Sequence, residues 1–301
     1  MRRVCLGLVF VGGVLMAATG MAETASPPVE NVIVNGRKVP DQEIQTFVES
    51  RAAPTFRLGK MARWEDGVCP IATGLKPAFQ DFIVQRLKQT AAKVGAPVSA
   101  DPHCRANIEI VFTTTPQALM DNVRKEHRYY LGFHYSSHQA DALAKVTHTI
   151  QAWYTTQIVD EMGIPHLETF LSDGTCEALT DFCPTTYHTN GTRLADGMHS
   201  SFAHVIIVVD PEKLRDYEIG ALADYIGFLA LAQPRAQDEC ETLPTIFNLL
   251  VPGCKDASAM REMTDGDLGY LRGLYHMTAD APLSRQENEI AYQMKQALQG
   301  R

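Results

Sequence analysis

The chain has 301 residues, of which 45% are hydrophobic and 21% charged, and its formal net charge is −8. This composition is sufficient for a full hydrophobic core, in one domain or in two closely packed subdomains. The acidic balance argues against nucleic acid as a partner, because the sequence has no basic stripe and no Lys/Arg run with interleaved aromatic residues.

Residues 1–22 have the pattern of a secretory signal peptide. Arg2 and Arg3 form a basic start, residues 4–18 are apolar, and a small-x-small cleavage site ends at Ala22. The apolar stretch is short and glycine-interrupted for a membrane span, although an uncleaved anchor is the alternative. We expect cleavage after Ala22, which changes the net charge from −8 to −10 because two arginines leave. The mature chain should then have no membrane span and be exported, to the periplasm or the extracellular space.

Cysteine usage supports the same compartment. Cys5 leaves with the signal peptide, and the cysteines that remain are Cys69, Cys104, Cys176, Cys183, Cys240 and Cys254. An even number of cysteines in an exported chain predicts three disulfides. Proximity in the sequence favours the pairs Cys69–Cys104, Cys176–Cys183 and Cys240–Cys254. Closing a loop the size of 240–254 stabilises a fold by about 3 kcal/mol. A cysteine metal site is the competing interpretation, but no C-x-x-C pair supports it.

The N-terminal part, residues 31–215, is predicted to be a mixed α/β subdomain. It follows a polar, proline-containing linker at 23–30 and begins with a short strand at 31–35. A helix at 41–48 comes next, and the Asp41 side chain is expected to cap it by accepting an N-terminal backbone N–H.

A strand at 69–72, a helix at 77–95 and a strand at 107–113 together predict a right-handed βαβ unit. Gly95 is the expected C-terminal stop of this helix. The apolar positions expected on one buried helical face are Phe79, Phe82, Ile83, Leu87 and Ala91.

The rest of this part alternates helix, loop and strand. Residues 116–128 predict an amphipathic helix, 129–138 a loop, 147–159 a long strand and 204–209 a buried strand. The Gly-, Thr- and Pro-rich excursion at 160–198 is long for a compact domain, so it is either functional or held by its disulfide.

The C-terminal part, residues 216–301, begins with the stretch around which the chain is organised. Residues 216–234 are apolar nearly all round, as in a helix buried inside a protein, and Pro234 ends them. A capping box of Thr264 and Asp267 opens another helix, and 284–298 forms a last amphipathic one. The overall expectation is an α+β fold with a mostly helical C-terminal part.

The histidines and tryptophans have both functional and structural interpretations. His134 and His138 have H-x-x-x-H spacing, which binds metal only if both lie on one helical face, and Gly132 argues against such a helix. His199 and His204 should point to opposite faces of a strand. Trp64 and Trp153 are expected in the core rather than in contact with a cofactor.

Several short runs resemble the zincin metallopeptidase fold. The run LALAQP at 229–234 resembles the tail that follows the H-E-x-x-H zinc motif, PTIFN at 244–248 resembles a downstream stretch of that group, and MTDGDL at 263–268 resembles its following helix. The chain is also similar to a set of exported bacterial proteins. The resemblance implies a mixed sheet and helices in the first half, one central buried helix, and a mostly helical remainder.

The zinc motif itself is degenerate. In the register that the resemblance implies, both histidines are replaced, by Ala223 and Gly227, and the glutamate by Asp224. Alanine and glycine supply no metal ligand, so no catalytic residue, zinc ion or other cofactor is expected. Asp224 is either a remnant base or a buried, hydrogen-bonded carboxylate. Gly220, Ala223 and Gly227 either leave an open groove or allow another element to pack closely.

The sequence therefore predicts an exported, disulfide-stabilised, zincin-like protein without zinc ligands. Its expected role is non-catalytic, either structural or the binding of a peptide or protein in the former substrate groove. The alternative is an active metallohydrolase with substitute ligands, for which His134 and His138 are the candidates, or an enzyme without a recognisable motif.

Overall fold

The computed structural model describes residues 39–168, 187–189, 196–235, 239–254 and 260–299. The predicted signal peptide, linker and first strand, together with the Cys176–Cys183 pair, lie outside the described residues. Residues 38–301 group into one compact unit. The division between 31–215 and 216–301 stays a prediction.

A six-stranded mixed sheet forms the centre of the N-terminal half. Its strands are β1 (Ala62–Arg63), β2 (Pro70–Thr73), β3 (Ile108–Phe112), β4 (Ile150–Val159), β5 (Pro165–Leu167) and β6 (His199–Val209). The strand order is β2-β3-β6-β4-β5, and β1 pairs with the start of β6. Strands β1, β2, β3 and β6 are parallel, whereas β4 is antiparallel to both β6 and β5. The predicted βαβ unit is confirmed, with β2 and β3 as parallel neighbours.

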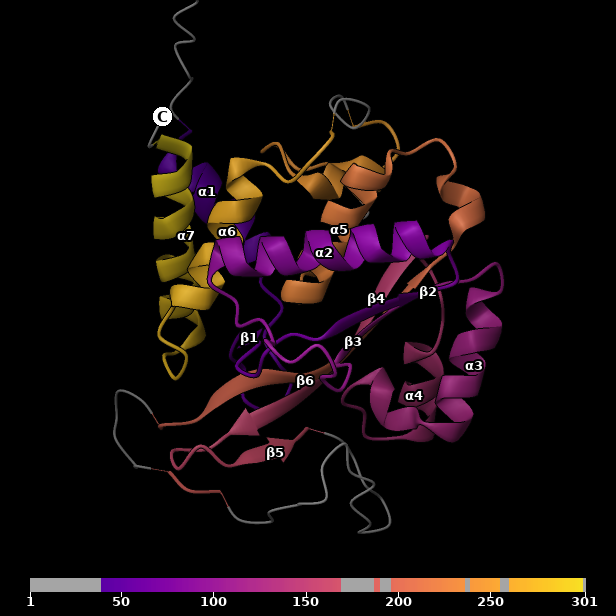
Figure 1. The fold of residues 1–301 in the computed structure, drawn as a ribbon. Helices are drawn as coiled ribbons and strands as arrows, with labels where there is room; N and C mark the ends of the chain where they lie inside the picture. The colour runs from indigo at the N-terminus through magenta and orange to yellow at the C-terminus, as the bar shows by residue number, and fades with distance from the viewer. Residues whose placement is uncertain (1–38, 169–186, 190–195, 236–238, 255–259, 300–301) are drawn as a thin grey trace, which may run out of the picture. The chain divides into compact units, whose positions relative to one another are not determined.

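Helices cover both faces of this sheet and form most of the C-terminal part (Figure 1). They are α1 (Asp41–Arg51), α2 (Pro77–Val94), α3 (Pro116–Glu126), α4 (Ser137–Leu143), α5 (Ile219–Leu231), α6 (Asp265–His276) and α7 (Leu283–Gln299), with short 3-10 turns η1 (Arg128–Leu131), η2 (Pro211–Leu214) and η3 (Ile246–Leu250). Helices α2 and α5 lie on one face, and α3, η1 and α4 on the other. The α+β class and the mostly helical C-terminal part are confirmed.

Helix α2 ends where the sequence predicts, but only part of its predicted buried face is buried. Gly95 ends it in the left-handed conformation, with φ of 87°, as predicted. Ile83 and Leu87 are buried, but the rings of Phe79 and Phe82 are 45% and 41% exposed. The expected apolar face is therefore wrong in its first turns, where the helix carries its phenylalanines to the surface.

Two local predictions were wrong near helix starts. Pro40, not Asp41, is the N-cap of α1; Asp41 lies in the first turn, and its carboxylate accepts a hydrogen bond from Lys295 at 2.5 Å. The predicted loop at 129–138 instead contains η1 and the first turn of α4. Ser136 starts α4 because its Oγ accepts the Gln139 N–H at 3.3 Å.

Strand β6 begins at His199, five residues earlier than expected from sequence. Its early residues pair with β1, where Ala62 lies opposite Ser200, so a partner distant in the chain extends the strand. Trp64 and Trp153 are buried, as predicted, with 2% and 4% of their surfaces exposed.

Helices α6 and α7 approach closely at two glycines that the sequence pattern did not single out. A Cβ atom on Gly269 would lie 2.9 Å from the Ala297 Cβ, and one on Gly273 would lie 2.6 Å from the Ile290 Cα. No side chain fits at these positions without moving a helix.

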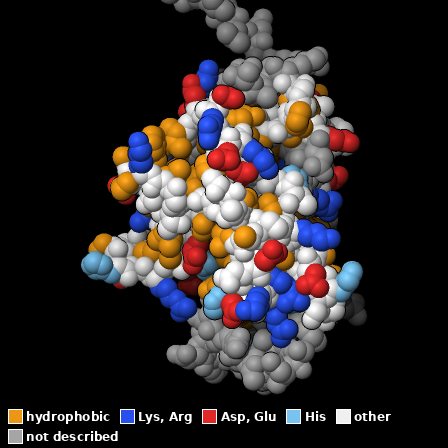
Figure 2. All heavy atoms as spheres, turned by 90° about the vertical axis from the view of Figure 1, so that its right-hand side faces the viewer, with side chains coloured by type: hydrophobic (Ala, Val, Ile, Leu, Met, Phe, Trp, Pro, Cys, Tyr) orange, Lys and Arg blue, Asp and Glu red, His pale blue; other side chains and the backbone are white. Residues whose placement is uncertain are grey.

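Two of the three predicted disulfides are present. Cys69–Cys104 joins the residue before β2 to the approach to β3, and Cys240–Cys254 closes the loop after α5. No described helix combines the length and the apolar character that a bilayer crossing requires. Figure 2 shows acidic and basic side chains intermixed over the face that carries α3.

Candidate functional site around helix α5

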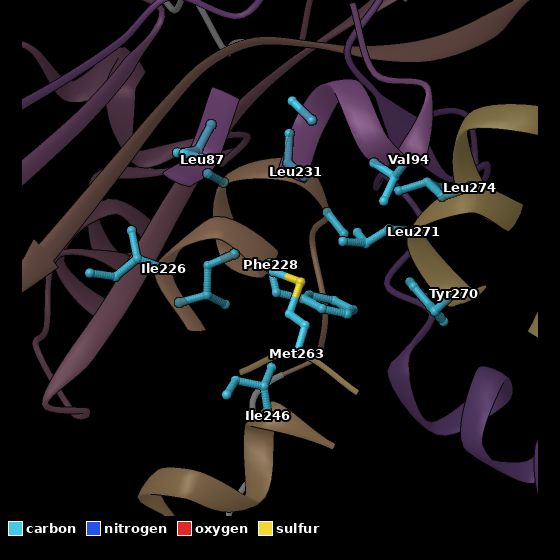
Figure 3. Close-up of a cluster of buried hydrophobic side chains, with 14 of the residues drawn as sticks. Leu87, Val94, Ile226, Phe228, Leu231, Ile246, Met263, Tyr270, Leu271 and Leu274 are labelled. Atoms are coloured by element: carbon cyan, nitrogen blue, oxygen red, sulfur yellow. The ribbon is translucent and has the colours of Figure 1, made fainter. Parts of the chain in front are cut away.

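Helix α5 is enclosed because its sequence is apolar on almost every side. From Ala221 to Leu231 every residue is buried except Tyr225, which is partly exposed. Figure 3 shows Ile226 and Phe228 pointing to opposite sides of α5. Both belong to one buried cluster with Leu231, Leu87 from α2 and Tyr270 from α6. The helix runs between the sheet layer and the C-terminal helices, so its side chains face both.

The C-terminal end of α5 is fixed by three aromatic side chains from three different elements. The Tyr154 hydroxyl donates a hydrogen bond to the Leu229 carbonyl at 2.9 Å. The Trp64 indole N–H donates to the Ala230 carbonyl at 2.7 Å. The Tyr275 hydroxyl donates to the Leu231 carbonyl at 2.7 Å. The last carbonyls of a helix have no partner within it, so these donors satisfy groups that would otherwise be buried unpaired.

Asp224 is held by an ion pair and a backbone group. The Arg86 guanidinium of α2 donates to both carboxylate oxygens, from Nε at 2.7 Å and from NH2 at 2.9 Å, and the Met263 N–H donates at 2.8 Å. Asp224 is 3% exposed. The hydrogen bond with Asp224 raises the pKa of Arg86. Every oxygen of Asp224 therefore has a partner within the fold, which is the structural interpretation of this residue.

The small residues of α5 do not border an open groove. Ala223 is fully buried. A Cβ atom on Gly227 would lie 3.4 Å from the Met263 Cε, so the Met263 side chain occupies the space beside it. Figure 3 shows Met263 pointing toward this cluster from the start of the α6 segment. Gly220 lies at the less enclosed end, where its added Cβ would be 3.8 Å from the Arg261 carbonyl oxygen. Close packing, rather than a groove, accounts for Ala223 and Gly227.

These positions do not fit the zinc ion that the resemblance implies. The donor set would consist of one carboxylate, and that carboxylate is already paired with Arg86. Among the described residues, no group of three or more His, Cys, Asp or Glu side chains is arranged to hold a metal ion.

The other two runs that carried the resemblance meet at one buried carboxylate. Asp267 accepts hydrogen bonds from the Thr245 hydroxyl at 2.6 Å and from the N–H groups of Ile246 and Thr264 at 2.8 and 2.9 Å. The predicted capping box with Thr264 is confirmed. Burial raises the pKa of Asp267 despite these donors. The two runs therefore join η3 to α6, which is a structural role.

The candidate histidines do not converge. His134 is buried, and its Nδ1 lies 2.8 Å from the Gly132 carbonyl oxygen, whereas His138 lies exposed on α4. His199 and His204 contact different acids, Glu65 at 2.8 Å and Glu109 at 3.2 Å.

A small hollow lies on the other side of α5, between this helix and strand β4. Its volume is about 90 Å³, and its lining residues are His148, Ile150, Gln151, Ala152, Tyr154, Tyr225, Leu229, Pro234, Arg235 and Phe247. A second, more polar hollow of about 200 Å³ adjoins Asp224 and Arg86 on the α2 side. The first hollow has room for one side chain rather than for a whole peptide.

Among the described residues, the outer edge of β4 beside this hollow has no paired strand over its first half, and the Gly132 backbone lies against it at Tyr154. The Asp210 N–H donates to the Thr149 carbonyl at 3.0 Å, so every second residue from Thr149 onward directs its backbone groups toward β6. The residues between them, which are Ile150, Ala152 and Tyr154, direct their backbone N–H and C=O groups away from β6. Strand β5 pairs only with 157–159. No strand of the described residues covers 150–154 on that side.

The end of β4 is held by a carboxylate that the sequence pattern did not identify. Asp160 accepts the Ile164 N–H at 2.9 Å, and its other oxygen lies 2.8 Å from His188 Nδ1 and 3.2 Å from His166 Nε2. Burial alone would raise the pKa of Asp160, but the donors from Ile164, His188 and His166 hold it well below its ordinary value. The only sequence signal was the unusual length of the excursion that begins here.

No family model matches the chain, and no curated protein or solved structure matches it either.

Proposed function

We propose that this chain is an exported, disulfide-braced protein with a zincin-like scaffold that binds extended peptide segments and does not cleave them. The observation that carries the proposal is that no described strand pairs with the outer edge of β4 at Ile150 and Ala152, directly beside the hollow under Tyr154. An exposed strand edge offers alternate N–H and C=O groups to a second strand, and a neighbouring pocket gives side-chain specificity.

The scaffold part of the proposal is supported by the arrangement of elements. An antiparallel strand, β4, lies beside the buried helix α5, and a mostly helical part follows. The loss of catalysis is supported by the residues that replace the zinc motif, since Ala223 and Gly227 have no donor atoms and Asp224 is paired with Arg86.

The test uses the full chain and a display library of random seven-residue peptides. Selected peptides should bind the wild-type protein, and Ala152→Pro should weaken their binding by about tenfold or more, because proline removes an outward N–H that such a peptide would need. Since that N–H points away from β6, the sheet keeps its hydrogen bonds.

The matched control is Ala72→Pro on β2, the opposite edge of the sheet, which should leave binding unchanged. Thermal melting of both variants establishes that they are folded. Absence of selected peptides, or equal binding by Ala152→Pro, would overturn the proposal. So would peptide cleavage with stoichiometric zinc that disappears when His134 and His138 are replaced.

A further inference from the structure

The hollow between α5 and β4 is bordered by two hydrogen-bond donors that have no partner within the fold. The Tyr225 hydroxyl and the Arg235 guanidinium both line it, and neither group makes a hydrogen bond or an ion pair with another residue in the described part of the chain. Burial raises the pKa of Tyr225 to about 12, although the positive charge of Arg51 opposes the rise. The hydroxyl therefore keeps its proton at neutral pH and can donate it in a hydrogen bond.

The charges around the hollow favour an anion. Of the described residues that line it, His148 and Arg235 have basic side chains and none is acidic. Glu287 is close enough for Arg235 to oppose the rise in its pKa that burial causes, but the two side chains form no ion pair. Arg51 is also nearby, but it is already paired with Glu241. A carboxylate that enters the hollow would accept hydrogen bonds from the two unpartnered donors without displacing an existing bond.

Strand pairing would direct one side chain of a bound peptide toward this hollow. Ile150, Ala152 and Tyr154 all line the hollow, so the face of β4 that they share is the one toward α5. A residue paired opposite one of them directs its side chain to the same face, with Cβ atoms about 4.5–5.5 Å apart. The Gly132 backbone lies against Tyr154, so a peptide pairs at Ile150 and Ala152. The peptide residue opposite Ala152 is then placed beside the hollow.

We propose that this hollow binds the carboxylate of an acidic side chain in the extended peptide that β4 holds, with the Tyr225 hydroxyl and the Arg235 guanidinium as its donors. This inference rests on the proposed function and adds the class of residue that the site prefers. The volume of about 90 Å³ accommodates one such side chain, and the apolar lining residues Leu229 and Phe247 contact its methylene groups. The strand edge contributes affinity that is independent of peptide sequence, and the hollow contributes selectivity.

The experiment sequences the selected seven-residue peptides and measures binding of the most enriched one by isothermal titration calorimetry. This peptide is acetylated and amidated at its ends, so that only a side chain can supply a carboxylate. We expect Glu or Asp at one fixed position. Tyr225→Phe should weaken binding about tenfold, because a hydrogen bond to a charged group in a partly buried site contributes strongly. Arg235→Gln should weaken binding about two- to fivefold, because water screens an ion pair at an exposed residue.

Two variants outside the hollow are the matched controls. Arg215→Gln removes the charge of an arginine whose side chain is 75% exposed, and Tyr292→Phe removes the hydroxyl of a tyrosine that is 60% exposed. Neither control should change peptide binding. Tyr225→Phe and Arg235→Gln should melt near the wild-type temperature, because they remove no side-chain hydrogen bond from the fold.

A second peptide, with its acidic residue replaced by the corresponding amide, completes a double-mutant cycle. It should bind wild type and Arg235→Gln equally weakly. Selected peptides that show no acidic preference, or that keep full affinity for Tyr225→Phe or for Arg235→Gln while depending on Ala152, would overturn this inference and leave the proposed function standing. Failure to select any peptide that binds the wild-type protein would overturn both.

Discussion

The two sides of helix α5 differ in how completely the rest of the fold covers them. On the side of α2 and α6, Ala223, Asp224 and Gly227 are enclosed by Arg86 and Met263. On the side of β4, Tyr225 and Leu229 line a hollow beside an open strand edge. Small residues thus mark the side that is closed at Ala223 and Gly227, where a polar hollow of about 200 Å³ remains beside Asp224 and Arg86. Large residues mark the side whose hollow of about 90 Å³ adjoins an unpaired strand edge. The size of a residue in the sequence therefore does not reveal whether the folded chain leaves a hollow beside it.

The largest expected effect is on the closed side. Gly227→Trp should reduce the free energy of unfolding by more than about 3 kcal/mol, because an indole must displace Met263 from a packed interior. Urea denaturation measures this change. Gly227→Ala is the control and should change stability by less than about 1 kcal/mol, since the flexible Met263 can give way to a single methyl group. A stable tryptophan variant would mean that the groove is open after all.

Asp224→Ala should cost about 2–3 kcal/mol, because it leaves the Met263 N–H and the Arg86 guanidinium without their acceptor. The Arg86 side chain is 33% exposed, so water compensates part of the loss. The control is Glu262→Ala, since Glu262 is 75% exposed and only 3.7 Å from the same arginine. Equal stabilities of the two variants in urea denaturation would contradict a buried structural role for Asp224.

The aromatic donors at the end of α5 allow a direct comparison of its two sides. Tyr154→Phe and Tyr275→Phe each remove one hydroxyl that donates to a helix carbonyl. Each should cost about 1 kcal/mol in urea denaturation. Only the Tyr154 change should alter peptide binding, because Tyr154 lines the hollow beside β4. A binding change in Tyr275→Phe of the same size would show that α5 responds as a whole rather than on one side.

The smallest effect concerns the end of β4, where Asp160 holds β5 in place. The pKa of Asp160 is lowered in the folded chain, so its ionised form stabilises the fold above about pH 4, the ordinary value for aspartate. That contribution is lost as the pH falls through the folded pKa. The difference in unfolding free energy between wild type and Asp160→Asn should therefore shrink as the pH falls from about 5 to about 3. A constant difference over this range would contradict the role of the charge.

Local signals in the sequence were sufficient for several elements. Gly95 ends α2 because glycine tolerates a positive φ, and Thr264 with Asp267 starts α6 because each satisfies a free N–H of the first turn. The βαβ unit and the Cys240–Cys254 pair followed from spacing alone. These features depend on residues that are close together in the chain.

Features that join distant segments could not be predicted. Phe79 and Phe82 match the helical period of α2, yet nothing in that period tells whether a neighbour covers them. The pairing of β1 with β6 likewise lengthened a strand beyond its local pattern. Arg86 belonged to the polar side of a helix, and no local pattern marks it as the partner of Asp224.

By itself, the sequence determined the α+β class, the buried character of α5 and the absence of zinc donors at Ala223 and Gly227. The tertiary structure alone decided which side of α5 is closed, which carbonyls Tyr154, Trp64 and Tyr275 cap, and which edge of the sheet is open. The reason is physical. Propensity and periodicity act over a few neighbouring residues, whereas enclosure and pairing depend on segments that only the folded chain brings together.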